Sequence, residues 1–138
     1  MSFIRAEIKN SKWKISKHEF YTAYHFAMQY NEWKDTVRGM IGLSAVVTDG
    51  MPHGNTISDP TSQQAMKLSE LQHKIDIVES IAKETDEQLY CWLLKGVTCE
   101  EITFTYLQTV MNIPCSKNTY YDRRRKFYYL LSKRLEIN

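Results

Sequence analysis

The residues best suited to chemistry lie near the C-terminus, between Ser116 and Lys126. A hydroxyl side chain and two polar residues, Lys117 and Asn118, precede a run of four consecutive basic side chains. Asn can pair with an adenine edge and Arg with a guanine edge, while Lys and Arg also neutralise phosphates. The pattern therefore indicates nucleic-acid binding, with the following candidate contacts: Ser116, Lys117, Asn118, Tyr121, Arg123, Arg124, Arg125 and Lys126.

The charge of the chain is distributed unevenly. Its 138 residues carry 18 Lys and Arg against 16 Asp and Glu, which gives a formal net charge of +2. Residues 115–138 hold seven basic and two acidic side chains, a net charge of +5, so the remaining 114 residues sum to −3. The near-neutral total therefore does not argue against a nucleic-acid partner at one end of the chain.

Two helices joined by a short turn are expected to position the basic stretch. The segment Thr98-Cys99-Glu100-Glu101 has the pattern of a capping box, which predicts a helix from Thr98 to about Met111. Pro114 cannot continue that helix, and Asn112 tolerates the left-handed conformation that a tight turn requires.

Ser116 is predicted to cap the last helix, which runs to about Leu135. The spacing of the apolar residues in this helix predicts one side that faces the core and one that faces outward. The outer side is predicted to carry Lys117, Asn118, Tyr121, Arg124 and Arg125. The arrangement matches a helix-turn-helix over residues 98–135, whose second helix reads the major groove of double-stranded DNA.

The upstream chain predicts further helices. A capping box at Ser16–Glu19 opens an aromatic helix that Gly39 and Gly42 are expected to stop near Val37. Asp59-Pro60 starts a second helix to about Lys83, and Thr85–Gln88 forms a capping box for a short helix that Gly96 ends.

The predicted fold class is all-α, a helical bundle with a C-terminal helix-turn-helix. Residues 1–38 form an N-terminal arm and the aromatic helix, and residues 39–58, which hold four of the five glycines, form a Gly-rich linker. Residues 59–138 form a helical domain that contains the helix-turn-helix.

Apolar residues of the second helix recur at spacings of three and four. This a/d pattern spans two heptads, which suits either packing within one domain or a homodimer interface. The candidate oligomerisation residues are Leu68, Leu71, Ile75 and Val78.

Other chemistries lack their residue patterns. No Gly-rich phosphate loop, nucleophile elbow or metal-ligand spacing occurs, so we expect no enzyme, no metal site and no cofactor. The three cysteines are expected to be small buried apolar residues. No secretory signal or membrane-spanning run is present, which predicts a cytoplasmic protein without a membrane partner.

Several segments resemble a known group of proteins. Gly96–Ile102 resembles the entry to the helix-turn-helix of sigma-factor region four, and Thr119–Phe127 resembles its recognition helix. Gly50–Gly54, Ser58–Thr61 and the aromatic stretch from Glu19 to Lys34 resemble RinA/ArpU-like transcriptional regulators from phages and prophages of Gram-positive bacteria. The resemblance covers about Ser16 to Leu135. It implies an all-α phage regulator that binds promoter DNA in the cytoplasm of a bacterial host.

Two alternatives remain open at the level of sequence. A small terminase subunit, which recognises phage DNA for packaging, is also helical and carries a helix-turn-helix. A protein-interaction module that contacts RNA polymerase would use the clustered aromatic residues of the first helix: Phe20, Tyr21, Tyr24, Phe26, Tyr30 and Trp33. These same aromatics also suit a core, and an exposed apolar patch would favour docking.

Overall fold

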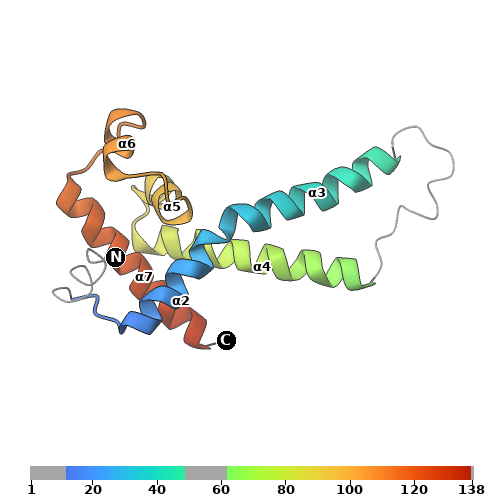
Figure 1. Ribbon diagram of the computed structural model, residues 1–138, viewed down its shortest axis with the longest axis horizontal. Helices are drawn as coiled ribbons and strands as arrows, with labels where there is room; N and C mark the ends of the chain where they lie inside the picture. Colours follow the sequence, from blue (N-terminus) through green and yellow to red (C-terminus); the bar gives the residue numbers. More distant parts are fainter. Residues whose placement is uncertain (1–11, 49–61, 138) are drawn as a thin grey trace. The chain divides into compact units, whose positions relative to one another are not determined.

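The computed structural model describes residues 12–48 and 62–137, with residues 42–48 as backbone only, and these residues form α-helices and no strand (Figure 1). The all-α fold class is therefore confirmed. The helices are α2 (Lys17–Met28), α3 (Tyr30–Thr48), α4 (Ser62–Thr85), α5 (Tyr90–Thr98), α6 (Phe104–Thr109) and α7 (Lys117–Ile137). The chain divides into two compact units, one of residues 30–76 and one of the residues on either side.

The first unit is built around α7. Helices α2 and α5 both pack on α7, α2 also packs on α5, and α6 packs on α5. Burial of each large apolar side chain contributes about 1.5–3 kcal/mol, so the most deeply buried residues carry most of this stabilisation. They are Phe20, Val78, Leu93, Val97, Leu107, Phe127, Tyr128 and Leu131.

The start of α2 follows the predicted capping box. The amide of Glu19 donates to Ser16 Oγ at 3.1 Å, and the amide of Ser16 donates to Glu19 Oε1 at 2.8 Å. Both hydrogen bonds of the predicted capping box are therefore confirmed. They could be predicted because they join residues only three positions apart.

The aromatic helix is interrupted at Gln29, where a single helix was predicted to run on to Val37. The side-chain amide of Gln29 donates to the carbonyl of His25 at 3.1 Å, and its backbone amide donates to the carbonyl of Phe26 at 3.3 Å. In a continuing α-helix the backbone amide of Gln29 would donate to His25, but the side chain occupies that carbonyl instead, and α2 ends there.

The predicted helix end near Val37 is wrong, because α3 continues through Gly39 and Gly42 to Thr48. A glycine in a helix interior costs only about 1 kcal/mol, which tertiary packing of Trp33 and Val37 can offset. Residues 49–58 of the predicted linker, and the predicted helix start at Asp59-Pro60, lie outside the described residues.

The second unit consists of α3 and the first part of α4, which run in opposite directions (Figure 1). Lys74 places its ammonium 5.6 Å from the centre of the Trp33 ring. Of the candidate oligomerisation residues in this unit, Leu68 and Leu71 are half-buried, whereas Ile75 is only 4% exposed. In the first unit Val78 is fully buried, so Ile75 and Val78 are both buried within the single chain.

Two other predicted capping boxes are wrong. The hydroxyl of Thr85 donates to the carbonyl of Ile81, and that of Thr98 donates to the carbonyl of Leu94, each at 2.7 Å. Each threonine therefore belongs to the last turn of the preceding helix. The third capping box was expected to open a helix over 98–111; instead α6 spans only Phe104–Thr109, and Glu100 and Glu101 lie in the turn before it.

Gly96 lies inside α5 instead of ending it. A Cβ atom added at Gly96 would collide with the hydroxyl of Tyr120 and approach its Cζ atom to 3.1 Å. Tyr120 is itself only 3% exposed, so its ring has little room to move. The absence of a side chain at position 96 is what allows the start of α7 to sit against α5.

We expect Gly96→Ala to destabilise the chain by about 1–3 kcal/mol through overpacking, although alanine favours a helix. Thermal and chemical denaturation followed by circular dichroism would measure the change. Gly39→Ala is the matched control, because nothing lies within 4 Å of the added Cβ and a neutral or stabilising effect is expected. Adding Tyr120→Phe to Gly96→Ala should recover part of the loss, and a Gly96→Ala variant as stable as the parent would contradict the packing.

Candidate nucleic-acid interface

A turn of residues 110–116 connects α6 to α7. Asn112 has a φ of 53°, which confirms the left-handed conformation predicted there. The amide of Ile113 donates to the carbonyl of Leu107 at 3.0 Å, and Trp92 Nε1 donates to the carbonyl of Met111 at 2.9 Å. The turn is therefore tied both to α6 and to α5, which restricts the direction in which α7 leaves it.

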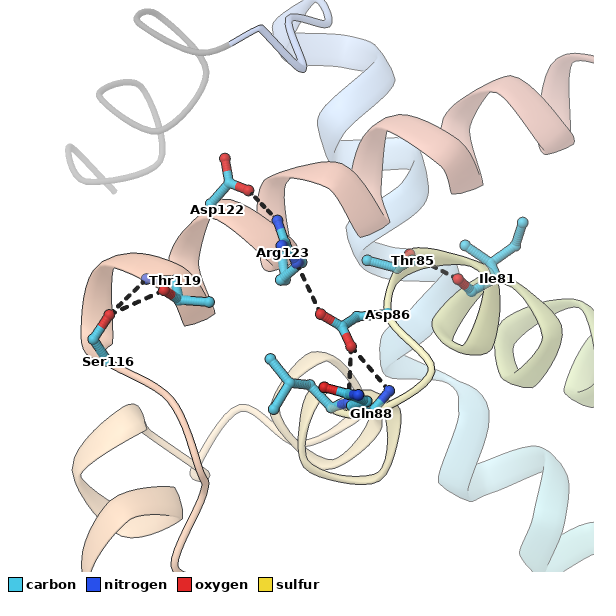
Figure 2. A network of polar contacts seen from close by, with 9 residues as sticks. Ile81, Thr85, Asp86, Gln88, Ser116, Thr119, Asp122 and Arg123 are labelled. Atoms are coloured by element: carbon cyan, nitrogen blue, oxygen red, sulfur yellow. Dashed lines mark hydrogen bonds and ion pairs between the residues drawn. The ribbon is translucent and has the colours of Figure 1, made fainter.

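The first turn of α7 is capped and exposed. Ser116 Oγ accepts a hydrogen bond from the amide of Thr119 at 3.2 Å, as predicted, and donates to Thr119 Oγ1 at 3.0 Å (Figure 2). Lys117 and Asn118 are both exposed beside this cap. The side chains suited to a base edge and to a phosphate are thus presented to solvent at the end of the helix.

Arg124 is not on the outer side of α7, where the sequence placed it. Its side chain is only 9% exposed, with its guanidinium carbon 5.3 Å from the ring centre of Tyr128 and 5.9 Å from that of Tyr121. Cation–π contacts in desolvated surroundings contribute about 2 kcal/mol each, which helps to hold a buried guanidinium. The side chain of Arg124 is therefore largely buried against two tyrosine rings.

Arg123 is engaged in an ion-pair network rather than presented to a phosphate. Its Nε atom lies 2.9 Å from Asp86 Oδ2, and its Nη1 atom lies 2.6 Å from Asp122 Oδ2 (Figure 2). Asp86 belongs to the loop between α4 and α5, so the network fastens α7 to that loop. Arg123, which the sequence predicted as a DNA contact, therefore already has two carboxylate partners within the chain.

Asp86 combines this ion pair with two backbone contacts. Its Oδ1 atom accepts from the amides of Gln88 at 2.9 Å and Leu89 at 3.0 Å. Burial opposes ionisation of Asp86, but the hydrogen bonds from Arg123, Leu89 and Gln88 outweigh it and lower the pKa of the carboxyl. Asp86 therefore stays charged and connects the residues that precede α5 to Arg123 of α7.

The remaining candidate contacts are half-buried. The ring of Tyr121 packs edge-on against Tyr120, with centres 5.2 Å apart. Arg125 has its Nε atom buried with no hydrogen-bond acceptor among the described residues. Lys126 lies 5.5 Å from the ring centre of Trp13, a residue of the N-terminal arm that the sequence did not connect with α7.

A small cavity of about 170 Å³ is lined in part by Tyr120, Tyr121 and Arg124, which lie in the first turns of α7. On its wall the hydroxyl of Tyr24 donates to Glu100 Oε2 at 3.2 Å. Burial, and then the charge of Glu100, raise the pKa of Tyr24. Arg124 also lines this cavity, so residues of α2, of the turn before α6 and of α7 share its wall.

The cysteines differ from their predicted environment. Cys91 is exposed, and Cys99 and Cys115 are half-buried, so none is a small buried core residue. Burial, followed by the charge of Asp86, raises the pKa of Cys115. Within residues 12–48 and 62–137, no cluster of histidine, cysteine and acidic side chains suits a metal ion.

Over the same part of the chain, no helix combines the length and the apolar character needed to span a membrane. Comparisons with protein-family models, curated proteins and solved structures found no match to this chain.

We expect Asp86→Asn to lower stability at pH 7 by about 1–2 kcal/mol, a value reduced for the partial exposure of Arg123. Because folding lowers the pKa of Asp86, its stabilisation is fully present above the unfolded pKa of about 4 and is lost as the pH falls through the folded pKa. Denaturation at pH 7 and pH 3 should show the difference from the parent shrinking at the lower pH.

Two further variants make the measurement specific. Asp86→Ala should cost more than Asp86→Asn, since only asparagine keeps an oxygen for the amides of Gln88 and Leu89. Asp35→Asn is the control, because Asp35 and Arg38 form an exposed pair with 74% and 71% exposed side chains. Equal stabilities of the Asp86 and Asp35 variants would show that the contacts of Asp86 do not stabilise the fold.

Proposed function

We propose that this chain is a sequence-specific DNA-binding protein that places the first turn of α7 in the major groove. The segment from α6 through the Asn112 turn to α7 acts as its helix-turn-helix. One helix of such a motif crosses the backbone while the second presents its N-terminal residues to the bases. The partner is double-stranded DNA, and no catalytic step is involved.

A single observation carries the proposal. Lys117 and Asn118 stand exposed at the capped start of α7, while Tyr120, Phe127 and Leu131 of the same helix are at most 3% exposed in the core. A recognition helix needs this combination, because its reading end must be free and its other side must be held rigidly. The ties at Trp92, Leu107 and Asp86 supply that rigidity.

We assign fewer residues to DNA contacts than the sequence predicted. Asn118 is the candidate for reading a base, and Lys117 contacts a phosphate. Arg125 and Lys126, further along α7, contact the DNA phosphate backbone. Arg123 and Arg124 become positioning residues, since one is ion-paired and the other is buried. The +5 charge of residues 115–138 still attracts DNA at long range.

The resemblance to RinA/ArpU-like regulators and to sigma-factor region four suggests the biological setting. We propose a phage or prophage transcriptional regulator that acts on promoter DNA in the cytoplasm of its host. The alternative of docking to RNA polymerase through the aromatic helix is less well supported. Four of its six aromatic residues are below 8% exposed, namely Phe20, Tyr24, Tyr30 and Trp33, and Tyr21 and Phe26 are half-buried.

Selection of bound duplexes from a random pool tests the proposal directly. Enrichment of a defined motif is expected, whereas equal affinity for every duplex at about 150 mM salt would remove sequence specificity.

On the selected motif, Asn118→Ala should cost about 1–3 kcal/mol in binding and change little on unrelated DNA. Lys117→Ala should weaken binding to all sequences and reduce the slope of log affinity against log salt by about 1. Lys95→Ala, which removes one exposed lysine on α5, is the control for charge alone. If all three variants bind alike, α7 does not read the DNA.

A further inference from the structure

The described end of the N-terminal arm lies against α7. The ring of Trp13 lies 5.5 Å from the ring of Tyr129, centre to centre, and Ile15 beside it is only 7% exposed. Trp13 also receives the ammonium of Lys126 at 5.5 Å from its ring centre. The arm is therefore fixed on the middle of the helix that we assign to DNA.

The arm occupies the side of α7 opposite the core. Successive residues of a helix are about 100° apart, so Lys126 and Tyr129 lie roughly opposite the buried Arg124 and Leu131. The helix is thus held from two sides, by the core on one and by Trp13 on the other. Lys117 and Asn118, at its first turn, stay uncovered.

This contact concentrates positive charge. Lys12 places its ammonium 5.1 Å from the same Trp13 ring that Lys126 approaches, and both Lys12 and Lys14 are exposed. No ion pair within the described residues involves Lys12, Lys14 or Lys126. An anion bound beside the Trp13 ring would be attracted by the ammonium groups of Lys12 and Lys126, and a DNA backbone supplies phosphates at regular spacing.

The distance along α7 suits that partner. Asn118 and Lys126 are eight residues apart, which corresponds to about 12 Å along a helix axis. The major groove of B-DNA is about 8.5 Å deep. If α7 enters the groove by its first turn, Lys126 and the arm therefore lie beyond the base edges, at the level of the phosphate backbone.

We propose that Lys12 and Lys14, held on α7 by Trp13, form with Lys126 a second contact surface for the DNA phosphate backbone. This inference rests on the proposed function and extends it to a part of the chain outside the helix-turn-helix. The arm supplies affinity and orientation, while the first turn of α7 supplies base recognition.

The double variant Lys12→Ala/Lys14→Ala tests this surface in the full chain. We expect its affinity for the selected duplex to fall about tenfold at about 150 mM salt and its salt slope to fall by about 2, with the preferred motif unchanged. The control is Lys83→Ala/Lys95→Ala, which removes the same charge from exposed positions on α4 and α5. Both pairs are exposed, so circular dichroism should show unchanged helicity.

Trp13→Ala provides the second variant, because it keeps both lysines and removes the ring that holds them on α7. We expect it to weaken binding in the same direction as the double lysine variant. Tighter binding by either variant would show that the arm obstructs the DNA and would overturn the inference. If the parent selects a motif and the arm variants match the control, only this inference fails; if the parent binds no duplex, the proposed function itself fails.

Discussion

The burial of one side of α7 is the interaction on which the first unit depends. Phe127 and Leu131 are fully buried and Tyr128 is 1% exposed, and both α2 and α5 pack on this helix. Close packing leaves little freedom at such a junction, which is why Gly96 must lack a side chain where Tyr120 approaches α5. A helix anchored in this way can present its first turn in a defined direction.

The same burial divides the basic run of α7 into different roles. Four adjacent cationic residues on one helix point to all sides, so some must face the core and its margins. Arg124 is stabilised there between two tyrosine rings, and Arg123 is neutralised by Asp86 and Asp122. Two of the basic side chains that make up the +5 charge of residues 115–138 are therefore already engaged within the chain.

Local hydrogen bonds explain which predictions succeeded. The caps at Ser16 and Ser116 and the left-handed Asn112 involve neighbouring residues, and all three are confirmed. The capping boxes at Thr85 and Thr98 failed because a threonine hydroxyl can equally donate to the carbonyl four residues earlier. The expected helix end at Gly39 failed for a related reason, since glycine weakens a helix without forbidding it.

The sequence by itself determined the helical class, the capped start of the last helix, the turn before it and the exposure of Lys117 and Asn118. These features depend on periodicity and on contacts within a few residues. Only the tertiary structure decided that Arg124 is buried, that Arg123 pairs with Asp86 and that Trp13 lies on α7. Those outcomes depend on residues far apart in the chain, whose meeting is set by how the helices pack and not by any local pattern.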